Sequence, residues 1–384
     1  MGVEQIRAPR PASYRTGPRD STMHYVSNSD SSAQQLTRSQ LKQEQGRSVS
    51  VRKQRQRRRL FPLIALLLTV AALGWYLTKP STTSTTSPTT TTSPATTTTT
   101  TVPYLPPSVK PTITPATANE GVWTAQDTWL PGAPRVMTTS WRPEASNPNV
   151  VAYASWMRSS SSLLALYPGY EGPGPSTLSR GPEAVPPSAR PALIATFNSG
   201  FYEKDSAAGF YTNGTLYYPM VNGLATVVEY TNGTVDIIDW QGGATPGPTI
   251  MMARQNLSLL VNNAQATPQV GNGPAFGVTL HGFPAVWRTA LGIDAHGNLI
   301  YVAAPEQTAA SLAQILLQLG CVRAMQLDIN PEWPIYNTYG GPGAANPTLK
   351  VPNPNQVPWR FLNSSTKDFF ALYAHVPGNV QTPW

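Results

Sequence analysis

One uninterrupted apolar run near the N-terminus constrains this chain more than any other feature. It extends from Leu60 to Leu77, 18 residues without a charge, and nothing else in the sequence approaches that length. At about 1.5 Å rise per residue, such a helix is near the lower limit for crossing a hydrocarbon core roughly 30 Å thick. A cleaved signal peptide fits less well, because no small-x-small cleavage site follows the run before Lys79. We therefore predict one transmembrane helix over residues 60–78, a signal anchor rather than a buried core helix.

Charge on the two sides of this run predicts its orientation. Residues 1–59 carry 13 Lys and Arg against 4 Asp and Glu, six of these cations lie in 52–59, and the whole chain has a net charge of +8. The positive-inside rule therefore places the N-terminus in the cytoplasm and the C-terminal domain outside the cell membrane. We predict a disordered basic tail over 1–59 whose charge is attracted to anionic membrane lipid, and we expect no nucleic-acid partner.

The sequence after the predicted helix divides into a stalk and one large domain. Residues 81–101 are almost wholly Thr, Ser and Pro, a composition that cannot bury a core and is typical of an extended stalk. Prolines continue the linker, so we assign 79–119 to stalk and linker and 120–384 to a globular ectodomain. The only cysteine, Cys321, excludes an intrachain disulfide, so a hydrophobic core must hold the domain together. A cell-envelope protein of a bacterium fits this combination.

Strand signals dominate the ectodomain. Hairpins are predicted at Tyr211–Tyr218, Val227–Asp239 and Ala290–Ala304, the first two turning at Asn-Gly, which favours the type I′ turn. Strands at 150–158 and 163–167 are predicted to pair around a serine run. One helix is predicted at 309–319, capped by Thr308 or Ser311 and closed by Gly320, with a strand at 322–329 after it. The fold class is α+β, with a mixed or antiparallel β-sheet and a few helices.

Familiar catalytic signatures are mostly missing from the sequence. It has no phosphate-binding GxxxxGK loop and no GxSxG elbow, and its histidines lack the spacing of zinc ligands. We expect no cofactor and no metal, although Asp328, Asn330 and Glu332 alternate as calcium ligands do. Polar residues instead gather at strand ends in three segments, namely 198–202, 287–289 and 326–330.

These segments resemble the phosphodiester glycosidase family. The family's Asn-x-Gly-Phe-Phe-like segment is matched by Asn198-Ser199-Gly200-Phe201-Tyr202, and its Arg-Thr before a small-Gly-Ile strand is matched by 288–294. Its helix ending in Leu-Gly, followed by Ala-x-x-Leu-Asp-Gly-Gly, corresponds to Leu319-Gly320 and 324–328. The chain has Ile329-Asn330 in place of the two glycines, which allow close backbone approach to a ligand. The resemblance covers about 120–376 and implies a divergent branch.

The resemblance implies a hydrolase that acts on a glycosyl phosphodiester of envelope or exopolysaccharide glycans. Asp328 would act at the anomeric carbon as nucleophile or as base for water, Arg288 would clamp the phosphate, and Asn198 would orient the substrate. A phosphate monoester departs readily, so one carboxylate and one clamp are sufficient. The further substrate-binding residues would be Gly200, Tyr202, Thr289, Asn330 and Glu332.

Other interpretations of the same residues stay open. Asp328 could pair with Arg323 or Arg288, Arg288 could be a structural ion-pair partner, and Glu332 could be an exposed loop residue. The alternative function is a non-catalytic envelope module that binds saccharide on aromatic side chains near the motifs. A purely structural protein held off the membrane by its stalk is the third hypothesis.

Overall fold

A computed structural model describes residues 102–173, 178, 180–279 and 282–375. The predicted tail, the predicted membrane helix and the Thr-rich part of the stalk lie outside the described residues. Within the described ranges, no helix has both the length and the apolar character needed to cross a membrane.

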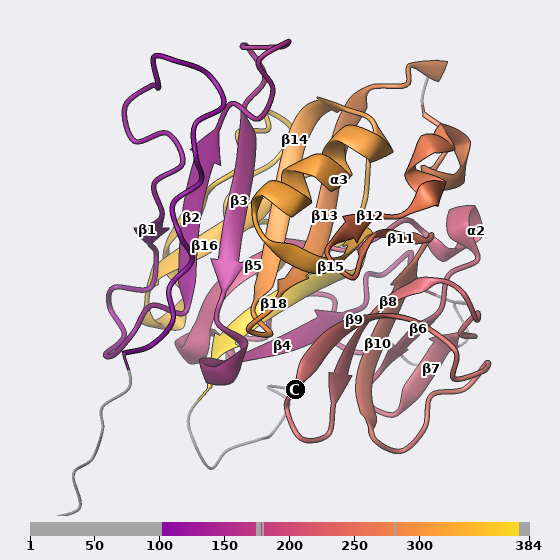
Figure 1. Cartoon of the computed structure of the whole chain (residues 1–384). Coiled ribbons are helices and arrows are strands. Elements are labelled where there is room, and N and C mark those ends of the chain that lie inside the picture. Colours follow the sequence, from indigo (N-terminus) through magenta and orange to yellow (C-terminus); the bar gives the residue numbers. More distant parts are fainter. Residues whose placement is uncertain (1–101, 174–177, 179, 280–281, 376–384) are drawn as a thin grey trace, which may run out of the picture. The chain divides into compact units, whose positions relative to one another are not determined.

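The described residues form three sheets, in which every neighbouring pair of strands is antiparallel (Figure 1). Sheet A has the order β1 (Thr124–Ala125), β2 (Val136–Trp141), β3 (Ala152–Met157), β14 (Leu299–Gln307), β13 (Val286–Asp294), β15 (Cys321–Gln326), β11 (Leu259–Asn262), β12 (Gln265–Ala266). Sheet B has the order β17 (Ala345–Leu349), β16 (Tyr336–Gly341), β5 (Leu193–Asn198), β18 (Phe369–Ala374), β4 (Ser162–Tyr167). Sheet C has the order β7 (Thr215–Tyr218), β6 (Phe210–Thr212), β10 (Ile250–Asn256), β8 (Ala225–Tyr230), β9 (Val235–Asp239).

Helices are few among the described residues. The longest is α3 (Ala309–Gln318), whose N-cap Thr308 accepts a hydrogen bond from the Ser311 N–H, and Gly320 follows its end at φ 78°. The other α-helix is the single turn α2 (Glu203–Ser206). Short 3₁₀ turns occur at Ser159–Ser161, Arg190–Ala192, Pro268–Gly271, Gly273–Phe276, Pro342–Ala344 and Arg360–Leu362. A mostly antiparallel β domain with few helices agrees with the predicted fold class.

The three predicted hairpins are confirmed. β6 and β7 pair around Asn213 and Gly214, which have φ of 47° and 74°, as a type I′ turn requires. The pairs β8–β9 and β13–β14 form the other two hairpins. The predicted pairing of strands 150–158 and 163–167 is wrong: both strands exist, but β3 pairs with β2 and β14, whereas β4 pairs with β18. The serine run between them forms a 3₁₀ turn that leads from one sheet to another, instead of a hairpin turn.

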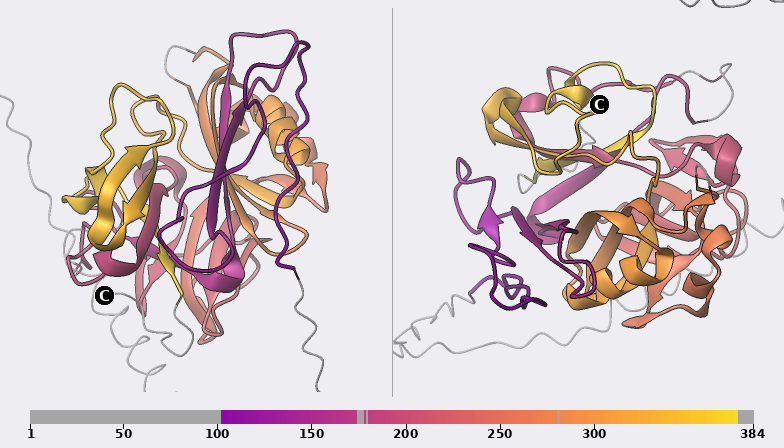
Figure 2. Two further views of the ribbon diagram at one scale, coloured as in Figure 1. Left: turned by 90° about the vertical axis from the view of Figure 1, so that its left-hand side faces the viewer. Right: turned by 90° about the horizontal axis from the view of Figure 1, so that it is seen from above.

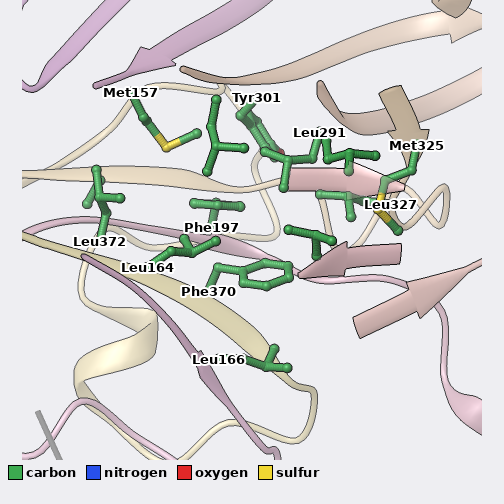
Figure 3. Close-up of a cluster of buried hydrophobic side chains, with 14 of the residues drawn as sticks. Met157, Leu164, Leu166, Phe197, Leu291, Tyr301, Met325, Leu327, Phe370 and Leu372 are labelled. Atoms are coloured by element: carbon green, nitrogen blue, oxygen red, sulfur yellow. The ribbon is translucent and has the colours of Figure 1, made fainter. Parts of the chain in front are cut away.

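Sheet A separates two hydrophobic cores, and α3 and sheet B lie on opposite faces of it (Figure 2). Trp156, Ile300 and Leu316 belong to the cluster under α3. The other face carries Leu291, Met325 and Leu327, which pack with side chains of sheets B and C (Figure 3). Alternate residues of the central strands therefore serve different cores, and both faces of sheet A are covered.

Part of the segment assigned to the linker contacts the domain. Val109 is buried and its N–H donates to the Gly121 carbonyl at 2.9 Å. Tyr104 stacks on His296 with ring centroids 3.7 Å apart, and its carbonyl accepts from Arg158. Proline-rich sequence at 103–111 thus lies against sheet A along its first strands.

Candidate active site

A large cleft opens beside the ends of β13 and β15. Its volume is about 1080 Å³, and the segments that line it come from the loop after β5, the 3₁₀ turns before β13 and the loop after β15. Among the predicted site residues, Asp328, Tyr202 and Asn330 line this cleft. Trp287, Trp333 and Lys367 line it as well, so aromatic, acidic and basic groups share one surface.

Asp328 lies beyond the end of β15 at an irregularity of the ladder. The Leu327 N–H donates to the Thr289 carbonyl at 2.8 Å, whereas the Thr289 N–H donates to the Asp328 carbonyl at 3.1 Å. Leu327 and Asp328 therefore both oppose Thr289, which is the hydrogen-bond pattern of a β-bulge. The predicted strand 322–329 ends earlier, at Gln326. A bulge changes the direction of side chains relative to regular alternation, and Asp328 lines the cleft.

The Asp328 carboxylate is almost completely buried and has two partners. Its Oδ1 accepts from the Asn330 N–H at 2.8 Å, and its Oδ2 accepts from the Lys367 ammonium, which is also buried. Burial raises the pKa of the Asp328 carboxyl above its ordinary value, and the charge of Lys367 opposes that rise. Lys367 thus favours the ionised form of the one carboxylate at the floor of the cleft.

Two aromatic rings flank the Lys367 ammonium. Its Nζ lies 4.4 Å from the centroid of the Tyr202 ring and 5.2 Å from that of Trp333. The two rings stand nearly perpendicular, at 87°, and the Lys204 ammonium lies 4.9 Å from the centroid of the Tyr202 ring. Cation–π contacts of this kind hold an ammonium without consuming its hydrogen bonds. The floor of the cleft therefore presents a fixed positive charge beside Asp328.

Asn198 lies behind Asp328 and does not line the cleft. Its Nδ2 donates to Thr289 Oγ1 at 2.9 Å, and its Oδ1 accepts from the Tyr301 hydroxyl at 2.8 Å and from the Ile335 N–H at 3.2 Å. Thr289 Oγ1 in turn donates to the Asp328 carbonyl at 2.7 Å. This buried network fixes the backbone that carries the carboxylate, so the structure gives Asn198 and Thr289 positioning contacts.

Gly200 lies where side chains from sheet C approach the loop after β5. A Cβ on Gly200 would lie 3.2 Å from Asn256 Cγ, a contact that requires the neighbour to shift. The Asn256 Nδ2 donates to the carbonyls of Gln326 at 2.8 Å and Leu327 at 3.2 Å. The glycine therefore permits sheet C to support the segment that leads to Asp328.

A second buried charge cluster adjoins the first. Arg254 of β10 is fully buried, donates through Nε to Asp368 Oδ2 at 2.8 Å and lies 3.3 Å from Glu203 Oε1. Its guanidinium also donates to the Phe201 carbonyl. Desolvation raises the pKa of Glu203 to about 7, although the Arg254 charge lowers it. Arg254 thus ties sheet C to the loop after β5 and to the residue that precedes β18.

Arg288 lies outside the cleft lining. Its Nε donates to the Gln307 carbonyl at 2.7 Å, and its Nη1 donates to the Phe276 carbonyl at 3.2 Å and to Gln326 Oε1. Desolvation lowers its pKa to about 10, and among the described residues it forms no ion pair. These contacts hold the wall of the cleft, whereas the predicted phosphate clamp stays a prediction.

Asn330 and Glu332 belong to the loop after Asp328. The Glu332 N–H donates to Asn330 Oδ1 at 3.0 Å, and Glu332 is exposed and lies outside the cleft lining. The alternation of Asp328, Asn330 and Glu332 therefore forms successive side-chain-to-backbone turns. In the part of the chain that the structure describes, no three His, Cys, Asp or Glu side chains are grouped to hold a metal ion.

The structure adds site residues that the motifs did not indicate. Lys367, Arg254, Glu203 and Asp368 come from three distant segments, and each becomes a site residue only because the sheets meet. One signal was available: the strand Ile250–Asn256 begins with four apolar residues and ends in three polar ones, so its end offers polar side chains. Lys367 follows a Ser/Thr-rich loop and carries no comparable pattern.

Fold and cleft together define a β-sheet domain that holds a buried acid–base pair at the floor of a large cleft. The family model of phosphodiester glycosidases matches residues 192–328, so the resemblance predicted from the motifs is confirmed over that range. This range includes the first two motif segments and the third as far as Asp328, where the range ends.

Solved structures of other proteins are similar to this chain. The chain is similar to the zebrafish N-acetylglucosamine-1-phosphodiester alpha-N-acetylglucosaminidase catalytic domain, auto-inhibited by its pro-peptide, with 17% identity, a TM-score of 0.43 and coverage of 66% of this chain and 87% of that one. A hypothetical protein from Synechocystis has 13% identity, a TM-score of 0.38 and coverage of 62% of each chain. Among curated proteins, none matches the chain.

Proposed function

We propose that this protein is a glycosidase that hydrolyses a glycosyl phosphodiester. The observation that carries the proposal is the Asp328 carboxylate, buried at the floor of the cleft beside a lysine, at the end of the range that matches the phosphodiester glycosidase model. Buried, paired carboxylates in clefts are concentrated at catalytic sites. A carbohydrate or glycosyl-phosphate substrate follows from the same match.

Asp328 and Lys367 supply complementary parts of the chemistry. In hydrolysis, a water oxygen adds to the anomeric carbon while the bond from that carbon to the phosphate oxygen breaks, and the electron pair leaves with the phosphate. The ionised Asp328 carboxylate either takes the proton of the water or attacks first and forms a glycosyl ester that water then cleaves. Lys367 lies at the same carboxylate, where its charge stabilises negative charge developing on the departing phosphate.

Polar and aromatic groups around this pair suit a sugar. Tyr202 and Trp333 offer ring faces and edges to the sugar, and Asn330 offers an amide for its hydroxyls. Asn198, Thr289 and Gly200 serve the substrate indirectly, because they fix the backbone beside Asp328. The proposed catalytic set is therefore smaller than the sequence motifs suggest.

The proposed setting is the outer face of the cell membrane. The apolar run at 60–78 and the basic tail before it support a single-pass anchor with a cytoplasmic N-terminus, and the Thr-rich stretch supports a stalk. From such a stalk, the cleft would reach glycosyl phosphodiesters of envelope polymers or exopolysaccharides.

A non-catalytic saccharide-binding module is the second candidate. Two observations favour it. The Asp328 carboxylate already has two partners, the Asn330 N–H and the Lys367 ammonium. Arg288 lies outside the cleft lining, so its contacts do not support the predicted phosphate clamp. Stacking of Trp287 and Trp333 on sugar rings would then supply most of the affinity.

Turnover by the purified full chain separates the two candidates. The protein is incubated with a panel of glycosyl phosphodiesters, and released sugar and phosphate monoester are measured together. We expect equal amounts of both products and a loss of at least about 100-fold in Asp328→Asn. Asp239→Asn, which changes an exposed aspartate of β9, is the matched control. Saturable binding without turnover would leave the binding module.

A further inference from the structure

Two kinds of side chain line the cleft. The charged and polar set, which we call the polar end, is linked around Tyr202 and Asp328 and contains Lys204, Asp205, Asp328, Asn330 and Lys367. The apolar set, which we call the apolar end, comes from three separate segments: Leu257, Val278, Phe283, Val286 and Trp287. One ligand that fills the cleft must therefore match both charged and apolar lining.

The apolar end is unusually exposed for side chains of its kind. Val278 is 91% exposed and Phe283 is 62% exposed. Large apolar side chains that gather around a cleft mark ligand-binding surface, whereas single exposed ones need no explanation. Here both side chains line the cleft, as do the half-buried Val286 and Trp287.

The wall that carries these side chains is anchored from behind. The buried Phe276 accepts at its carbonyl from Gln326 Nε2 at 2.8 Å and from Arg288 Nη1 at 3.2 Å. Gly277 follows at φ 96°, and a Cβ there would lie 2.7 Å from the Phe201 ring and 3.1 Å from Ile329. The backbone that leads to Val278 is thus held close to Phe201 and Ile329, which also line the cleft.

The polar end is suited to a phosphate group. The Lys204 and Lys367 ammonium groups lie 4.9 and 4.4 Å from the centroid of the Tyr202 ring, and Lys367 is bound to Asp328. In a phosphodiester bound there, one ester oxygen joins the phosphate to the sugar at Asp328. The other ester oxygen joins the phosphate to a second group, which can extend along the apolar side chains. Aliphatic side chains of Leu257, Val278 and Val286 offer no hydrogen bonds to a second sugar. Glu306 at the rim is exposed, and its carboxylate already accepts from Asn147 at 2.8 Å.

We propose that the alcohol esterified to the phosphate is a hydrocarbon chain, so that the substrate is a lipid-linked glycosyl phosphodiester. This inference rests on the proposed function for the reacting end and adds the class of the leaving group. The sugar and phosphate occupy the polar end, and the first methylenes of the chain lie along Val278, Phe283 and Trp287.

The expected gain in affinity for a hydrocarbon chain follows from the number of methylenes that become buried. Each methylene taken out of water contributes about 0.8 kcal/mol, which is roughly a fourfold gain in affinity. Hexyl phosphate has five more methylenes than methyl phosphate, and coverage of only two of them gives about a tenfold gain or more.

The test compares these two phosphate monoesters as ligands of the full chain in lipid nanodiscs. Calorimetry gives both affinities, and turnover of the hexyl and methyl esters of one sugar 1-phosphate is measured beside it. We expect hexyl phosphate to bind at least about tenfold more tightly, and Val278→Ser and Phe283→Ser to reduce that preference while methyl phosphate binding is unchanged. Leu105→Ser, at a side chain that is 47% exposed away from the cleft, is the control.

The outcomes separate the inference from the proposed function. Equal affinities for the two monoesters, or a preference that both serine variants retain, would overturn the lipid-linked substrate even if the methyl ester is hydrolysed. A preference for hexyl phosphate without hydrolysis of either ester would support the apolar subsite and refute the glycosidase.

Discussion

The buried pair of Lys367 and Asp328 allows a quantitative test that does not depend on the substrate. Lys367→Met removes the ammonium from a carboxylate whose side chain is only 4% exposed, so we expect Asp328 to take up a proton. Keeping a carboxyl protonated above an ordinary pKa near 4 costs about 1.4 kcal/mol per pH unit, which amounts to about 4 kcal/mol at pH 7. That agrees with the roughly 3–5 kcal/mol typical of breaking a buried ion pair.

The sign of the pH dependence follows from the proton balance. In the variant the folded state holds a proton that the unfolded chain releases above pH 4 or so, and stability therefore falls as pH rises. At pH 5 the expected loss is only about 1–2 kcal/mol. Lys204→Met, which changes an exposed lysine over the same Tyr202 ring, should stay within about 0.5 kcal/mol of the parent.

Urea unfolding at pH 5, 6 and 7 measures these differences. The set comprises the parent, Lys367→Met, Asp328→Asn and the double variant, which removes both charges and should be more stable at pH 7 than Lys367→Met. A loss in Lys367→Met that is equal at pH 5 and pH 7 would refute the reasoning, because it would show that Asp328 does not respond to the missing charge.

Two further predictions concern other buried groups. Desolvation raises the pKa of Glu229 to about 8 from an ordinary value of 4.5, so the free energy of unfolding should fall as pH rises through that interval. Urea unfolding at pH 5 and pH 9 should show a smaller difference in Glu229→Gln than in the parent. A difference in the variant as large as that in the parent contradicts this. Thr289→Val removes the hydroxyl between Asn198 and the Asp328 carbonyl and should cost about 1–3 kcal/mol, whereas Thr289→Ser keeps the bonds. An equal cost in both variants would mean that the methyl group, not the hydroxyl, matters.

Local features of this fold could be predicted because each depends on neighbouring residues. The Asn213-Gly214 turn needs two residues with positive φ, and the helix after Thr308 needs a cap, an apolar stripe and a closing glycine. The place of Asp328 near the end of a strand could be predicted for a similar reason, because β15 ends two residues before it. In each case the physical cause lies within a dozen residues of sequence.

Contacts between sheets could not be predicted in the same way. Lys367 reaches Asp328 across 39 positions of sequence, and Arg254 reaches Asp368 across 114. The strands at 150–158 and 163–167 show the same limit, because adjacency in sequence favours a hairpin and only the core decides that they join different sheets. Arg288 was predicted to clamp a phosphate from its motif, but two of the three oxygens that accept from it come from Phe276 and Gln307, which no motif connects to it.

The charges of the site lie where the three sheets meet. Asp328 extends from sheet A, Arg254 belongs to sheet C, and Lys367 and Asp368 immediately precede a strand of sheet B. Replacing a buried ion pair with apolar residues of similar volume is often neutral or stabilising, so fold stability alone does not explain two such pairs at one junction. An apolar junction would join the sheets equally well, but it would leave no ionised carboxylate at the cleft floor. The ionic junction therefore fits the chemistry proposed for Asp328, with Arg254 fixing the neighbouring loop and Lys367 fixing the charge.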